Sequence, residues 1–96
     1  MPLTPQEQLE TLQRLARLDT EHLRNKHLVI QTVPEEQRVF LLRGLVTEAH
    51  KVARRAKDVD HELTLVLEDL VAEARHDIRD ILSRRRRKNM RVVKTT

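Results

Sequence analysis

Apolar residues recur along this chain at steps of three and four, the spacing that places side chains on one face of an α-helix. The pattern is clearest between Val59 and Leu82, where no Gly or Pro interrupts it. Its apolar positions are Leu63, Val66, Leu67, Leu70, Ala74, Ile78 and Ile81. This stretch is therefore predicted to be an amphipathic helix with a buried stripe, and it runs directly into five consecutive basic residues.

A second amphipathic segment opens the chain. Pro5 suits the first position of a helix because its missing N–H has no partner there, and Thr4 and Glu7 have the spacing of a capping box. The stripe that follows consists of Leu9, Leu12, Ala16, Leu23 and Ile30. We predict a helix over about residues 5–27, and its extension to Gln31 is left open.

A third amphipathic segment follows the Val33-Pro34 break, where the residue before proline is pushed out of the helical region. We predict a helix over about residues 34–57. Its stripe consists of Leu42, Leu45, Val46, Ala49, Val52, Ala53 and Ala56. Gly44 lies within it at a cost of about 1 kcal/mol against Ala, which suggests close approach by a neighbouring helix. Phe40 lies off the stripe, so it covers the end of the first helix or contacts a second copy.

The segment 57–61 has two interpretations. Asp58 or Asp60 can cap a new helix and the sign of the charge changes here, which favours a tight turn before a helix over about residues 60–86. However, apolar residues continue across the segment in phase, at Ala49, Ala56, Leu63 and Leu70. The alternative is therefore a short first helix followed by one long helix over about residues 34–86.

Composition narrows the fold class. One Gly and three Pro among 96 residues leave few turns for strands, so the chain is predicted to be all-α. We expect residues 1–83 to form one small three-helix antiparallel bundle. Hydrophobic residues make up 39% of the chain, with one aromatic ring. Because such a small core buries little surface, we also expect a homodimer with coiled-coil-like helix packing.

The net charge of +4 is unevenly distributed. Residues 1–83 hold 12 Lys and Arg against 15 Asp and Glu, whereas residues 84–96, the basic arm, hold seven bases and no acid. Within the helical part, residues 38–57 carry six bases and one acid, and residues 58–80 carry eight acids and two bases. These two segments are predicted to lie antiparallel, within one chain or between two copies.

The basic arm is the first candidate binding site. Its bases are Arg84, Arg85, Arg86, Arg87, Lys88, Arg91 and Lys94. Guanidinium groups bind phosphates, but no aromatic residue lies near them for base stacking, so we predict contact with the backbone of duplex DNA or structured RNA. Residues 89–96 lack a periodic pattern and are predicted to be partly disordered in isolation. The alternative function is a helical adaptor whose tail binds an acidic protein partner or serves as a nuclear localisation signal.

A second group of bases, the mid-chain basic cluster, lies in the segment 34–57. It consists of Arg43, Lys51, Arg54, Arg55 and Lys57. With His50, these residues extend a phosphate-binding surface or neutralise the acidic segment that follows. The pattern does not separate the two interpretations.

Other chemistry has little support in the sequence. Glu73 and His76 have the Glu-x-x-His spacing of di-iron bundles. Such a site needs two further carboxylates and a second copy of the motif, which a homodimer could supply, and by helical angle both residues fall on the polar side, so no metal site or cofactor is predicted. There is no Cys, no nucleophile beside a His and no Gly-rich loop, so we expect no enzyme. The chain also lacks a run of roughly 20 apolar residues, and we expect a cytoplasmic protein, or a nuclear one in a eukaryote.

Overall fold

The computed structural model describes the backbone of residues 2–95 and the side chains of residues 2–86. In this part of the chain the fold is all-α, with no strand, as predicted. The helices are α1 (Pro5–Ile30), α2 (Glu35–Ala56) and α3 (His61–Thr95).

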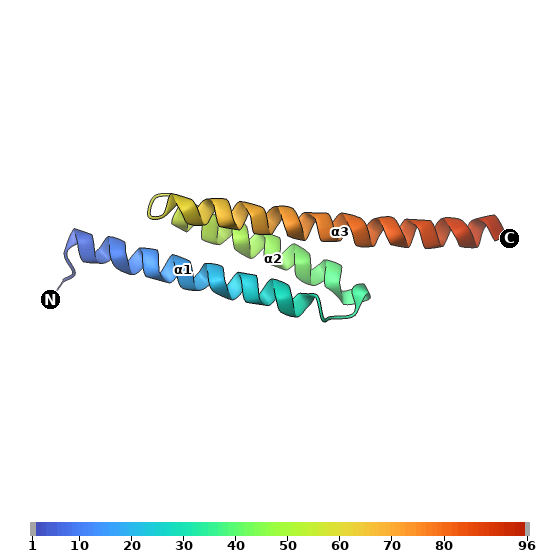
Figure 1. Ribbon diagram of the computed structural model, residues 1–96, viewed down its shortest axis with the longest axis horizontal. Helices are drawn as coiled ribbons and strands as arrows, with labels where there is room; N and C mark the ends of the chain where they lie inside the picture. The colour runs from blue at the N-terminus through green and yellow to red at the C-terminus, as the bar shows by residue number, and fades with distance from the viewer. Residues whose placement is uncertain (1, 96) are drawn as a thin grey trace.

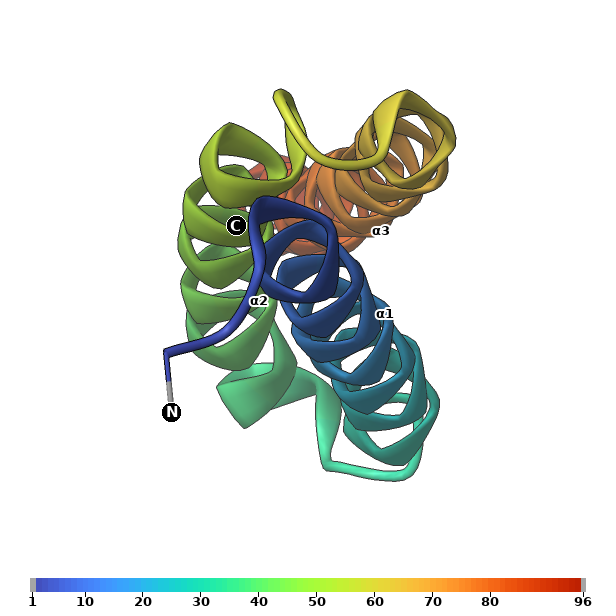
Figure 2. The ribbon, with the colours of Figure 1, turned by 90° about the vertical axis from the view of Figure 1, so that its left-hand side faces the viewer.

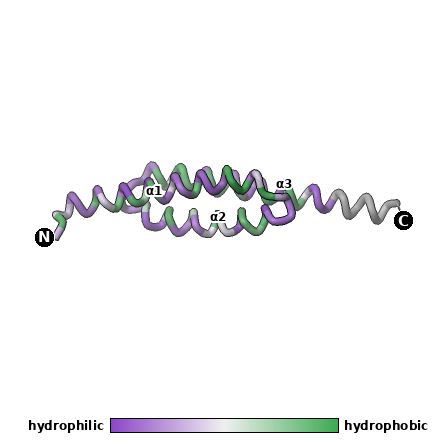
Figure 3. The backbone as a smooth tube through the Cα atoms, turned by 90° about the horizontal axis from the view of Figure 1, so that it is seen from below, coloured by the Kyte–Doolittle hydropathy of each residue, from purple (hydrophilic) through white to green (hydrophobic). Residues whose placement is uncertain are grey.

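The three helices alternate in direction and pack side by side in an elongated bundle, as Figures 1 and 2 show. The Cα atoms extend over 73 × 20 × 14 Å. α2 and α3 share the largest interface, and α1 packs more closely on α2 than on α3. The helices are staggered: the start of α1 projects from one end of the bundle (Figure 3), and α3 projects from the other end (Figure 1).

The chain turns between α2 and α3, which makes the alternative of one long helix wrong. The backbone amides of Val59 and Asp60 both donate to the carbonyl of Ala56, at 3.1 and 2.8 Å. α1 supports this turn, because Gln13 Nε2 donates to the Val59 carbonyl at 2.7 Å and Arg17 Nε lies 3.5 Å from Asp60 Oδ2. Apolar residues in phase across the turn thus belong to two helices that bury them against each other.

The core lies between the three helices. Its fully buried large side chains are Leu42, Leu45, Leu67 and Ile81. The stripes predicted for α2 and α3 are confirmed, since all their members are buried or half-buried. Val39 and Val71 also belong to the core, and two threonines, Thr20 and Thr64, are buried with their hydroxyls hydrogen-bonded to backbone carbonyls of the preceding turn.

The stripe predicted for α1 is only partly buried. Ala16, Leu23 and Ile30 are in the core, but Leu9 and Leu12 are 36% and 51% exposed, so their assignment to the buried face was wrong. The reason is the stagger of the helices: this part of α1 lies beyond the turn that joins α2 to α3 (Figure 1).

The predictions for the outer face of α2 also need correction. Gly44 is exposed, and a Cβ built on it would have no atom within 4 Å, so no helix approaches it closely. Phe40 is 80% exposed and therefore does not cover the end of α1. Its contact with a second copy stays a prediction.

The helix ends differ in how their free backbone groups are satisfied. The Thr4 hydroxyl accepts from the Glu7 amide at 3.2 Å, as predicted for an N-cap. At the other end of α1, Arg38 Nη2 donates to the carbonyls of Gln31 and Val33, at 3.2 and 2.9 Å, and so holds the connection to α2. α1 and α3 end later than predicted, at Ile30 and at Thr95.

Candidate nucleic-acid interface

The basic arm begins where α3 leaves the bundle beside the first turn of α2. Arg84 Nη2 lies 3.4 Å from Glu35 Oε1 and 3.3 Å from Asp80 Oδ2, and Arg85 Nη2 donates to the Glu35 carbonyl at 3.1 Å. A depression beside these contacts is lined by Pro34, Glu35, Glu36, Arg84 and Arg85. Two of the seven predicted phosphate ligands, Arg84 and Arg85, therefore already contact the bundle.

The remaining bases of the arm follow on the part of α3 that projects from the bundle (Figure 1). The Arg86 side chain is exposed. The other four side chains lie outside the described residues, although the backbone that carries them is helical; they belong to Arg87, Lys88, Arg91 and Lys94. Arg and Lys are good helix formers and no Gly or Pro follows Pro34 except Gly44, which agrees with a helix that continues this far.

The mid-chain basic cluster lies on the exposed side of α2. Lys51 and Arg55 line a shallow depression together with Asp19 and Glu48. The last member of the cluster, Lys57, follows the opposite end of α2 from Glu35, and a helix of this length separates them by about 30 Å at 1.5 Å per residue. The end of the cluster is therefore remote from the start of the basic arm, and Arg43, about 12 Å along α2 from Glu35, is the member nearest to it.

The bases of residues 38–57 and the carboxylates of residues 58–80 do not pair directly, although Arg84 of α3 pairs with Glu35 of α2. Among the described side chains, no ion pair joins a base of residues 38–57 to a carboxylate of α3, and the polar side-chain contact between these segments joins Arg75 Nη2 to His50 Nε2 at 3.3 Å. The α3 carboxylates that form ion pairs contact α1 or the arm instead.

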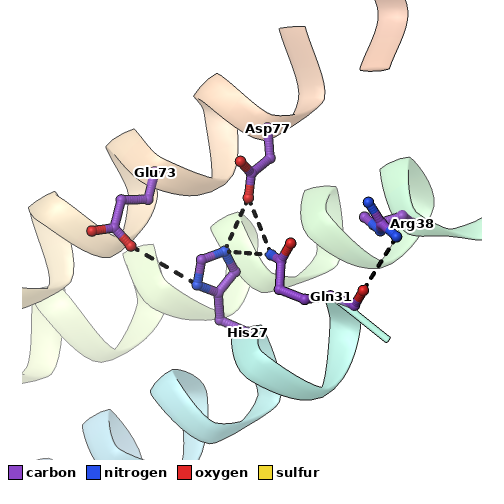
Figure 4. Close-up of polar contacts among 5 residues, drawn as sticks. All are labelled: His27, Gln31, Arg38, Glu73 and Asp77. Atoms are coloured by element: carbon purple, nitrogen blue, oxygen red, sulfur yellow. Dashed lines mark hydrogen bonds and ion pairs between the residues drawn. The ribbon is translucent and has the colours of Figure 1, made fainter. Parts of the chain in front are cut away.

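The structure also contains a polar cluster between α1 and α3 that the sequence pattern did not indicate (Figure 4). His27 lies between two carboxylates, with Nε2 at 3.2 Å from Asp77 Oδ2 and Nδ1 at 3.9 Å from Glu73 Oε2. Gln31 Nε2 donates to the same Asp77 oxygen at 3.2 Å. The partners are about 50 residues apart in the chain, so no local spacing could have indicated the cluster. It joins the C-terminal half of α1 to α3.

The same region contains Glu73 and His76, the pair with the spacing of a di-iron motif. Both line a shallow depression with His27 and Asp77. Within the described part of the chain, no three His, Asp or Glu side chains gather in a way that could hold a metal ion. The contacts of His27 and Gln31 with Glu73 and Asp77 form a polar bridge between α1 and α3.

Comparison of the chain with protein-family models, with curated protein sequences and with solved structures produced no match. In the described residues, none of the helices has an apolar stretch long enough to cross a membrane.

Proposed function

We propose that this protein binds the phosphate backbone of duplex DNA or structured RNA through the basic arm, as a nucleic-acid-associated accessory or regulatory protein. The observation that carries the proposal is the exit of α3 from the bundle: after Arg85, which still contacts α2, the helix carries five bases and no acid and projects beyond the other helices (Figure 1). The rest of the chain is net acidic, although it contains the mid-chain basic cluster.

The contacts at the start of the arm refine the expected binding. Arg84 and Arg85 already have partners on α2 and α3, so the five bases from Arg86 onward are the principal phosphate ligands. Five contacts predict that log affinity for duplex DNA falls with log salt at a slope of about −4 to −5. Phosphate contacts do not read bases, so duplexes of unrelated sequence should bind about equally.

Two matched double variants of the full chain test this proposal. Arg86→Gln with Arg87→Gln should flatten the salt slope by about 2, whereas Arg84→Gln with Arg85→Gln should change it less because these side chains are engaged by the bundle. Binding can be followed by fluorescence anisotropy at several salt concentrations. An unchanged slope in the first variant would mean that the arm is not the binding element, and the mid-chain basic cluster would become the candidate.

The competing function is a helical adaptor, and the outer face of α2 favours it. Phe40, the only aromatic residue, is exposed there, and Gly44 leaves an open position one turn later. Exposed aromatic side chains are frequent anchors of protein interfaces. Phe40→Ala should abolish binding of a protein partner on this face and leave the affinity for nucleic acid unchanged, which separates the two functions.

We also propose that two copies of the chain associate. The support is the number of large apolar side chains that the chain leaves exposed, five of them between Leu3 and Leu18. Light scattering should report about twice the chain mass of 11.4 kDa at micromolar concentration. A chain that stays monomeric at that concentration would contradict this proposal without affecting the proposal for the arm.

A further inference from the structure

The first two turns of α1, residues 5–12, extend past the end of the α2–α3 hairpin, and we call them the α1 overhang (Figure 1). Gln13 marks its limit, because this residue bonds to Val59 in the turn between α2 and α3. Eight helical residues rise about 12 Å. The bundle therefore ends in a step, where α1 extends beyond the turn that joins α2 to α3.

The apolar stripe of α1 continues along the overhang, where neither α2 nor α3 packs against it. Leu9 and Leu12 are seven and four residues before Ala16, so they share its helix face, but they are exposed where Ala16 is buried. The charged residues of the same segment, Glu7 and Glu10, lie toward the opposite side of the helix. The overhang thus presents an apolar face without charge.

We propose that a second copy of this chain covers this face. Two overhangs pack antiparallel about a two-fold axis, and each fills the step at the end of the other's α2–α3 hairpin. Leu9 of each copy then lies opposite Leu12 of the other, which gives the self-complementary contact of a two-fold interface. This inference rests on the proposed association and names its surface.

The shape of the step favours a second copy over another partner. The step is as long as the overhang that forms it, so the overhang of one copy has the right length to fill the step of another. Every copy of the chain has both. Charge agrees with this orientation, because the start of α1 is the positive end of its helix dipole. In the antiparallel arrangement it points toward the partner's turn, which contains the exposed carboxylate of Asp58.

The arrangement has two measurable consequences. The contact covers only two to three helical turns of each chain, so the dissociation constant should be micromolar rather than nanomolar. One chain is 73 Å long, and two chains that overlap by about 12 Å should form a particle about 130 Å long. Dimers that pair side by side, for instance through Phe40, would stay close to the length of one chain.

The experiment compares the full chain with two double variants of matched chemistry. Leu9→Gln with Leu12→Gln changes the overhang, and Leu28→Gln with Leu65→Gln changes two leucines that are 65% and 49% exposed elsewhere. Light scattering gives the mass and small-angle X-ray scattering the maximum length. We expect a dimer about 130 Å long for the parent and the control, a monomer for the overhang variant, and helical circular dichroism for all three.

Each other outcome overturns the inference. A dimer that persists in the overhang variant, or a parent dimer of about the length of one chain, leaves association intact but places it on another surface. A parent that is monomeric at high micromolar concentration overturns association as well. Assemblies that grow with concentration would mean that the overhang binds a different part of its neighbour. The parent's length decides the question even if the overhang variant does not fold.

Discussion

The first half of α1 and the middle of α3 have similar apolar spacing but opposite surroundings. In α3, Leu67 and Leu70 are buried against α2, whereas Leu9 and Leu12 of α1 are exposed. A second helix lies beside α3 for most of its length, but α1 begins before the hairpin does (Figure 1). Periodicity therefore predicts which side of a helix is apolar, and the stagger of neighbouring helices decides how much of that side is covered.

The largest effect is expected when a charged side chain is placed in the buried middle of α3. Leu70→Asp would place a carboxylate without a partner in the core, and we expect a loss of several kcal/mol, enough to unfold a small domain. Thermal unfolding followed by circular dichroism measures it. Asp69→Asn, one residue away and exposed, should change stability by no more than about 0.5 kcal/mol. Equal melting of both variants and the parent would mean that the assigned helix face is wrong.

The next test compares the two halves of α1 directly. Leu23 is 2% exposed, so Leu23→Ala should destabilise the chain by about 2–4 kcal/mol through lost burial and a cavity. Leu12→Ala removes the same atoms from an exposed position and should cost less than about 1 kcal/mol in the monomer. Urea denaturation at low protein concentration gives both values. Similar losses would show that the overhang is covered within the chain.

Gly44→Ala tests an exposed position of α2 on which no other helix packs. A Cβ at this site meets nothing within 4 Å, so the substitution should stabilise the chain by about 0.5–1 kcal/mol through helix propensity alone. The midpoint of chemical denaturation should rise accordingly. A loss of stability would indicate that a helix, for instance one of a second chain, does approach Gly44 closely.

The smallest effect is expected at the boundary between the covered and exposed parts of α1. Arg17 pairs with Asp60, but its side chain is 66% exposed, so Arg17→Gln should cost no more than about 0.5 kcal/mol. The loss should also shrink as salt is added, because the Arg17 side chain is accessible to ions. A loss above about 1 kcal/mol would mean that this pair, rather than core packing, fixes where the hairpin ends against α1.

Much of this fold was determined by the sequence itself. The apolar spacing predicts three helices, Thr4 and Pro5 mark the start of the first, and Pro34 interrupts the chain before the second, because these are local effects of backbone geometry and hydrogen bonding. The concentration of bases after Ser83 is likewise a property of the sequence, and the charge pattern alone identifies the basic arm as a candidate site.

Only the tertiary structure decided what each apolar or charged face meets. It turned the chain between Ala56 and His61, left the α1 overhang bare, placed His27 between Glu73 and Asp77, and engaged Arg84 with Glu35. These features depend on the relative position of helices that are far apart in the chain. The spacing of residues within one helix does not predict the relative position of two helices, because that position depends on how whole helix faces pack against one another.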